Sequence, residues 1–152
     1  MEITFRLAKL ADMDVIVSFH VALNEYDGTV ADPARARAGL QLLMGRDDFG
    51  GVWLICADGD PVGYIVLTWG FSLEFGGRDA FVDELYIEED YRGQGVGRQT
   101  LAFAESICQA RNIRALHLEV ERENANAQVV YEKVGFEKRA GYFLMSKRLG
   151  GA

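Results

Sequence analysis

The stretch of sequence that decides the fold is Arg92-Gly93-Gln94-Gly95-Val96-Gly97. It lies between a strand-like run at residues 80–87 and a segment, at about residues 95–112, in which apolar residues recur at helical spacing. Such a loop exposes backbone N–H groups at a helix N-terminus, which carries about half a positive charge. We therefore predict that it binds a phosphate or pyrophosphate group, to which Arg92 and Arg98 can add side-chain charge.

Two other phosphate-binding loops do not match this stretch. The dinucleotide fingerprint GxGxxG, started at Gly93, would need its third glycine where Arg98 stands. The loop of nucleoside triphosphatases needs a Gly-Lys-Ser/Thr sequence that does not follow here. On the loop alone, a glycine-rich turn that serves only the passage from strand to helix remains an alternative.

The remaining pattern predicts a mixed α/β fold, with about four helices around one central, mostly antiparallel sheet. The expected strands are residues 3–7, 52–57, 62–69, 80–87, 115–120 and a closing strand at 142–147. The expected helices are a first one capped by Asp12 and stopped at Asp27-Gly28, then residues 33–45, 95–112 and 124–134. The crossover from residue 80 to 120 predicts one parallel strand pair. No linker or repeat interrupts this order, so we expect one domain over residues 1–152.

Length, composition and charge narrow the class of protein. A chain of 152 residues with 49% apolar and 26% charged residues is typical of one globular domain. No apolar run approaches the roughly 20 residues of a membrane-spanning helix. The first residues do not resemble a secretory signal, so we expect a cytoplasmic protein with no membrane partner. A net charge of −7 argues against nucleic-acid binding and agrees with a cationic substrate.

The two cysteines and the two histidines form no recognisable site in the sequence. Cys56 and Cys108 have no CxxC spacing, and we interpret them as reduced thiols. His20 and His117 lie far apart in the chain and follow no pattern of metal ligands. The sequence therefore predicts no metal.

Two blocks of the sequence resemble the GCN5-related N-acetyltransferase (GNAT) family. The first family block, Arg/Gln-x-x-Gly-x-Gly/Ala, is matched by residues 92–97. The second, Asn-x-x-Ala-x-x-x-Tyr-x-x-x-Gly-Phe, is matched by Asn124, Ala127, Tyr131, Gly135 and Phe136. The order of the expected strands and helices from residue 2 to 148 also resembles that of the family. The resemblance implies an acetyl-CoA-dependent N-acetyltransferase in which the strand before the glycine loop splays from its neighbour at a bulge, and acetyl-CoA lies in the resulting gap.

The resemblance also implies which residues bind acetyl-CoA, the co-substrate. The pantetheine arm would lie along the backbone of Leu85, Tyr86 and Ile87. The pyrophosphate would rest on the N–H groups of Gly93, Gln94, Gly95, Val96, Gly97 and Arg98. Asn124 would contact the pantetheine or the reacting region, and Lys133 the outer phosphates, with a solvated surface lysine as the alternative for Lys133. Edge strands in this family imply a homodimer.

Acid–base groups are expected at the end of the central strand and on the last helix. An amine that is protonated at neutral pH must lose a proton before it attacks a thioester, and Asp83 or Glu84 could accept that proton. Strand alternation sends the two side chains to opposite faces, so only one is expected in the cleft. A resemblance to spermidine/spermine N-acetyltransferases favours Asp83, whose shorter side chain would need a bridging water. The resemblance implies Tyr131 as the acid that protonates the CoA sulfur.

The acceptor is predicted only as a class. The resemblance implies that specificity comes from the first two helices and from loops beside the cleft. Besides Asn24, acidic and aromatic residues occur there, namely Glu25, Tyr26, Asp27, Phe71, Glu74 and Phe75. This mixture favours a small cationic amine such as a polyamine, an amino acid or an aminoglycoside. A protein-lysine or N-terminal acetyltransferase and a catalytically silent CoA-binding regulatory module remain alternatives.

Overall fold

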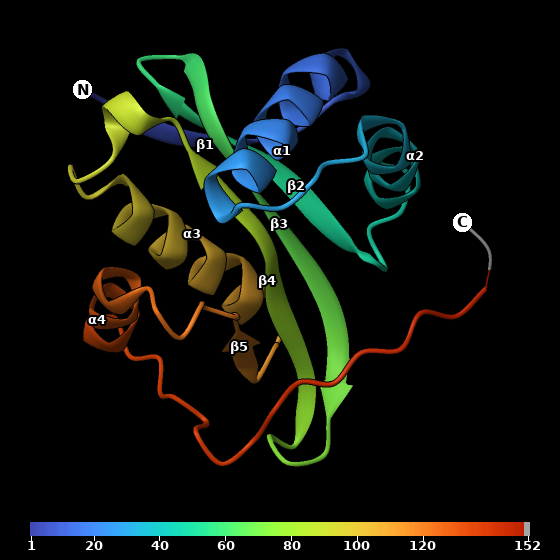
Figure 1. The fold of residues 1–152 in the computed structure, drawn as a ribbon, viewed down its shortest axis with the longest axis vertical. Helices are drawn as coiled ribbons and strands as arrows, with labels where there is room; N and C mark the ends of the chain where they lie inside the picture. Colours follow the sequence, from blue (N-terminus) through green and yellow to red (C-terminus); the bar gives the residue numbers. More distant parts are fainter. Residues whose placement is uncertain (151–152) are drawn as a thin grey trace. The chain divides into compact units, whose positions relative to one another are not determined.

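The structure, a computed structural model, describes residues 1–150 as two units. The first unit spans Met1–Glu119 and contains the whole β-sheet, and the second begins at Val120. Figure 1 shows their helices and strands. Among the described residues, no helix combines the length and the apolar character needed to cross a bilayer.

The sheet of the first unit has five strands in the order β1-β2-β3-β4-β5. They are β1 (Ile3–Leu7), β2 (Gly50–Ala57), β3 (Asp60–Ser72), β4 (Gly77–Ile87) and β5 (Ala115–His117). The first four are antiparallel neighbours, and β5 pairs with β4 in parallel. This arrangement confirms the predicted mixed α/β fold with one parallel pair.

Helices cover both faces of this sheet. Helices α1 (Met13–Asp27) and α2 (Pro33–Met44) lie on one face, and α3 (Val96–Ala110) lies on the other (Figure 1). Alternating residues of β2 point to the two sides, so Leu54 packs with Ile16 of α1 while Trp53 packs with Ala104 of α3. Strand β2 and the middle of β3 are therefore buried on both faces, and β4 lies beside β3 in the sheet.

The predicted helix boundaries are close to those observed, with one different role for a capping residue. Gly28 ends α1 in a left-handed conformation (φ 73°), and Asp32 accepts a hydrogen bond from the Arg35 N–H at the start of α2. Asp12 stands at the N-cap position of α1, as predicted, but its side chain makes no capping hydrogen bond. Its carboxylate instead binds the Arg6 guanidinium at 2.8 and 2.9 Å and the Lys9 N–H at 2.8 Å.

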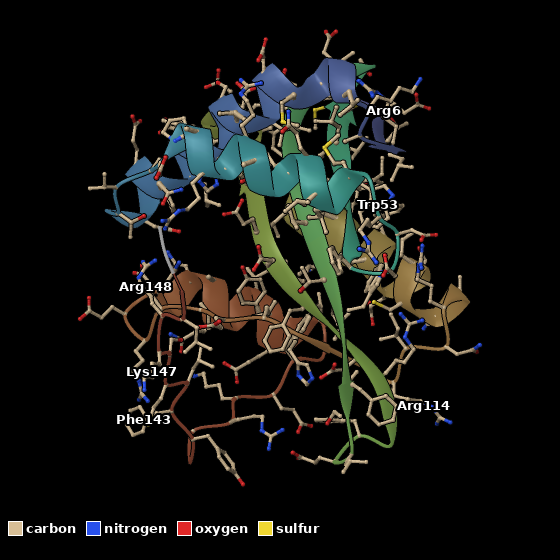
Figure 2. The ribbon with its side chains drawn as sticks, turned by 90° about the vertical axis from the view of Figure 1, so that its right-hand side faces the viewer. Arg6, Trp53, Arg114, Phe143, Lys147 and Arg148 are labelled. Atoms are coloured by element: carbon tan, nitrogen blue, oxygen red, sulfur yellow. The ribbon has the colours of Figure 1, made fainter. Side chains whose placement is uncertain are left out.

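The second unit contains α4 (Ala125–Lys133) and an extended C-terminal segment. The predicted strand at residues 142–147 is wrong, because no strand forms between residue 134 and residue 150. Figure 2 shows Phe143, Lys147 and Arg148 on this segment, which is drawn without a strand arrow. Residues 142–145 form a short apolar run that is compatible with a strand, but a strand also needs a partner for its backbone groups. Likewise β5 ends at His117 and not at Val120.

Candidate active site

The glycine loop passes from β4 into α3 through two left-handed residues. A short 3-10 turn at Glu89–Tyr91 precedes it, Gly93 has φ 72°, and Gly95, the N-cap of α3, has φ 84°. Glycine adopts such angles without the steric cost that other residues bear. Within the described part of the chain, the backbone N–H groups of residues 93–98 donate no hydrogen bond. They form a row of free donors at a helix N-terminus, the arrangement that binds an anion.

Two side chains of the loop stabilise it through hydrogen bonds to backbone carbonyl groups. The Nε of Arg92 donates to the Ile87 carbonyl at 2.7 Å, and the Nε2 of Gln94 donates to the Asp90 carbonyl at 2.8 Å. The Arg92 guanidinium also lies over the rings of Tyr26 at 4.5 Å and Tyr86 at 5.4 Å. Arg92 therefore connects the loop to the end of α1 and to β4, a role that the sequence did not reveal.

The sheet opens along the last half of β4. The parallel ladder with β5 covers only Asp79, Ala80 and Phe81. From Val82 to Ile87, β4 pairs with β3 on one side, and no described strand pairs with its other edge. The backbone of Leu85, Tyr86 and Ile87 therefore presents a free edge that leads into the glycine loop. This is the predicted splay of the sheet.

A β-bulge at Asp83 changes which face its neighbours occupy. Val66 of β3 pairs with Glu84 and Leu67 pairs with Val82, so Asp83 is an extra residue on β4. Both carboxylates consequently line one cavity of about 240 Å³, together with His20, Ala36, Gly39, Leu40 and Val66. The expectation that only one of the two acids faces the cleft is wrong, because the bulge interrupts the alternation on which it rested.

The Glu84 carboxylate is bound by two donors from different elements. The Tyr64 hydroxyl donates to its Oε1 at 2.6 Å, and the His20 Nδ1 lies 3.0 Å from the same oxygen. The Asn24 amide donates to the His20 carbonyl at 2.9 Å and lies 3.3 Å from the His20 Nε2. Because the carbonyl orients the amide, the His20 Nε2 accepts a hydrogen bond from Asn24. The His20 Nδ1 is then protonated and donates a hydrogen bond to the Glu84 carboxylate. Burial, and then the charge of Glu84, raises the pKa of Tyr64.

The Asp83 carboxylate has a different environment. Its side chain reaches solvent, and no hydrogen bond or ion pair within residues 1–150 engages it. Desolvation by the surrounding protein raises the pKa of Asp83, and the negative charges of Glu84 and Glu119 raise it further. His20 acts on this pKa in the opposite direction. A carboxyl group with a raised pKa and no fixed partner is suited to accept a proton.

The other predicted site residues lie in the second unit. The Asn124 side chain accepts from the Ala127 N–H at 3.1 Å and so caps α4. Tyr131 is partly buried, and its ring contacts that of Phe136 edge-on at 6.1 Å between centroids. Lys133, the last residue of α4, is exposed. The roles of Asn124, Tyr131 and Lys133 towards acetyl-CoA stay predictions.

Comparison with known proteins decides the family. Residues 18–136 match the model described as the acetyltransferase (GNAT) family. The chain belongs to this family. The match covers both sequence blocks, the glycine loop and the carboxylate-lined cavity, and GNAT proteins are acyltransferase enzymes.

The chain is similar to GNAT proteins of several kinds. It is 30% identical to an uncharacterised N-acetyltransferase of Methanocaldococcus jannaschii, over 75% of this chain and 52% of the relative. It is 28% identical to the aminoglycoside N(6′)-acetyltransferase type 1 of Stenotrophomonas maltophilia, over 76% of this chain and 90% of the relative. The chain spans about half the length of the first curated relatives that it matches. The crystal structure of an integron cassette protein from the Cole Harbour Salt Marsh metagenome superposes with a TM-score of 0.83 at 32% identity, over 97% of this chain and 91% of that one.

Sequence reasoning missed two residues of this GNAT site. His20 and Tyr64 bind Glu84 from α1 and β3, and they stand 64 and 20 positions from it in the chain. No spacing rule connects such distant positions, and only the packing of α1 on the sheet brings them together. The predicted acceptor residues at 71–75 lie at the opposite end of β4, where Phe75 packs on His117, and their role stays a prediction.

Proposed function

We propose that the chain is an acetyl-CoA-dependent N-acetyltransferase that transfers the acetyl group directly to a primary amine of a small cationic molecule. The proposal is supported by three neighbouring features that lie along β4 and the loop after it. The free N–H groups of the glycine loop, the free edge of β4 and the cavity with Asp83 and Glu84 follow one another from residue 98 back to residue 83. An anion cradle, a groove for an extended arm and an acid–base pocket are the three parts that this reaction needs.

Acetyl-CoA fits the first two parts. Its pyrophosphate would accept hydrogen bonds from the N–H groups of residues 93–98, beside the exposed Arg98. Its pantetheine amides would pair with the free edge of β4 at Leu85, Tyr86 and Ile87, as an added strand does. In this proposal Asn124 contacts the pantetheine and Lys133 approaches the outer phosphates.

Two side chains, Asp83 and Tyr131, move the protons during the transfer of the acetyl group. Asp83 takes a proton from the acceptor ammonium through a water molecule, which leaves a neutral amine. The nitrogen lone pair attacks the thioester carbonyl carbon, a C–N bond forms, and the C–S bond breaks. The Tyr131 hydroxyl gives its proton to the departing sulfur, and the second proton that the nitrogen loses as the amide forms passes through water to the Tyr131 oxygen, which restores the phenol. Glu84 is the weaker candidate for the base, because Tyr64 and His20 already donate to its carboxylate.

The cationic acceptor is supported by the charge of the cavity and by one relative. Asp83 and Glu84 line the cavity, and the aminoglycoside N(6′)-acetyltransferase is similar to this chain over most of its own length. Polyamines, basic amino acids and aminoglycosides therefore form the first panel of acceptors. A cytoplasmic location and a homodimer formed through edge strands stay part of the same proposal.

A thiol-release assay tests the function. Acetyl-CoA is incubated with the chain and with polyamines, amino acids, aminoglycosides or peptides, and the free thiol of CoA is measured. We expect release with at least one small amine. Release only with peptides would favour a protein acetyltransferase, and binding of CoA without any release would favour a regulatory CoA-binding module. If calorimetry detects no binding of CoA, the proposal is wrong.

A further inference from the structure

The cavity between α1, α2 and the bulge of β4 is acidic beyond what one reacting amine requires. Two carboxylates line it, and its single basic lining residue, His20, already bonds to one of them. The nearby arginines of α2 do not balance this charge. Arg37 binds Asp14 at 2.7 Å and Arg35 lies 3.9 Å from Asp32, and neither arginine lines the cavity.

Glu84 lines this cavity, and one of its two carboxylate oxygens accepts no hydrogen bond from residues 1–150. Both of its donors, the Tyr64 hydroxyl and the His20 Nδ1–H, bind Oε1, and within residues 1–150 no group bonds to Oε2. These two hydrogen bonds hold the Glu84 carboxylate in place from β3 and from α1. Glu84 is therefore a fixed negative charge with an unused oxygen, whereas Asp83 has no fixed partner.

This division of roles has a consequence for the acceptor. We propose that Glu84 binds a second ammonium group of the acceptor while Asp83 takes the proton from the amine that is acetylated, so that the substrate is a short linear diamine. The inference rests on the proposed function and adds its substrate class. After one nitrogen has lost its proton, the other remains charged and paired with Glu84, which keeps the acceptor in place during the transfer.

Size and charge favour a diamine over the other small cationic amines. A cavity of about 240 Å³ is smaller than the roughly 300–1,000 Å³ typical of sites for drug-sized ligands, which disfavours an aminoglycoside. A basic amino acid would bring its own carboxylate beside Asp83 and Glu84, with no unpaired cation lining the cavity to receive it. A diamine meets both acids with opposite charge and carries no anion.

His20 is a positioning residue in this arrangement. It reaches from α1 to Glu84 on β4, and Asn24 sets the tautomer that donates to the carboxylate. Without that hydrogen bond, only Tyr64 would hold Oε1, and the carboxylate could rotate away from the second ammonium group. An asparagine at position 20 places an amide N–H close to where Nδ1 stands, so it provides a conservative replacement.

Three ligands that differ by one charged group test the proposal. Cadaverine, a five-carbon diamine, differs from pentylamine by one ammonium group and from lysine by lacking a carboxylate. Binding of each to the chain is measured by calorimetry with CoA present. We expect cadaverine to bind at least about tenfold tighter than either of the other two. The Glu84→Gln variant should lose the preference over pentylamine, while its affinity for CoA stays unchanged.

Variants of His20 separate positioning from folding. His20→Ala should weaken cadaverine binding and raise the KM for the amine more than it lowers kcat, and His20→Asn should restore most of the affinity. Equal binding of cadaverine and pentylamine, or a preference that survives in Glu84→Gln, would overturn the inference. In that case thiol release with pentylamine would still support the N-acetyltransferase, whereas diamine binding without thiol release with any amine would contradict the proposed function alone.

Discussion

At the scale of single residues, Asp83 and Glu84 are neighbours in the chain with opposite environments. Glu84 accepts hydrogen bonds from Tyr64 and His20, while desolvation and nearby negative charges raise the pKa of Asp83. Neighbouring carboxylates in different surroundings can divide acid–base and electrostatic roles. Replacing Asp83 and replacing Glu84 should therefore have different effects on the reaction.

The pH dependence of the reaction identifies the base. Asp83 accepts a proton only when ionised, and its pKa lies above the ordinary aspartate value of 3.8, so kcat/KM for the amine should fall as the pH decreases through this raised pKa. Asp83→Asn should remove this acid limb and lower the rate by about 10²–10⁴-fold. Glu84→Gln removes a negative charge that raises the pKa of Asp83. In this variant the decrease of kcat/KM in acid should remain but occur at a lower pH. An unchanged limb in Asp83→Asn would assign the base elsewhere.

The proposed acid is tested by removing one oxygen atom. Tyr131→Phe should lower kcat far more than it changes the KM for acetyl-CoA, because the hydroxyl acts on the departing sulfur and the ring still packs on Phe136. Steady-state kinetics with the best amine from the acceptor panel measures both constants. Unchanged turnover would exclude Tyr131 from the mechanism.

At the scale of elements, the glycine loop depends on backbone conformation more than on empty space. A Cβ at Gly95 would meet no atom within 4 Å, but its φ of 84° is a left-handed angle that costs other residues about 1–2 kcal/mol. Gly95→Ala should therefore lower the melting temperature and raise the KM for acetyl-CoA several-fold, because the N–H groups of the loop change direction. Thermal denaturation and steady-state kinetics measure the two effects.

Gly97 provides the matched control for this loop. It lies in the first turn of α3, and a Cβ there would stand 3.7 Å from the Ile87 Cδ1, an ordinary contact. Gly97→Ala should keep or slightly raise stability, because alanine favours a helix by up to about 1 kcal/mol over glycine. If both variants lose the same affinity, the loss comes from filling the loop and not from its left-handed turn.

Most elements could be predicted because they follow local rules. The periodic apolar residues of α1, the proline at the start of α2 and the turn at residues 58–61 act within a few positions of the chain. The predicted closing strand at 142–147 does not form, because a short apolar run does not by itself supply the partner that the backbone groups of a strand need. The resemblance implied a bulge in the strand before the loop, but its position at Asp83 was not predicted, since that depends on the register between β3 and β4.

At the scale of the whole molecule, the base should reduce stability. Folding raises the pKa of Asp83, so the native state binds this proton more tightly than the unfolded state does. The stabilisation is complete at a pH below the pKa of the unfolded state, and it is lost as the pH rises through the pKa of the folded state. Asp83→Asn should therefore melt at a higher temperature than the wild type near neutral pH, with the difference shrinking in acid. Melting temperatures of both proteins across this pH range test it. Functional sites commonly contain residues that reduce the stability of the protein but are needed for its activity, so that replacing them raises stability and lowers activity.

By itself the sequence determined the glycine loop, the order of strands and helices, and the membership of the GNAT family, because these depend on short motifs and local periodicity. Only the tertiary structure decided that Asp83 and Glu84 share a cavity and that His20 and Tyr64 hold Glu84. The reason is physical: a bulge sets the direction of the two acids, and the packing of α1 on the sheet brings the donors to them. Neither the register between strands nor the docking of a helix is contained in the spacing of residues along the chain.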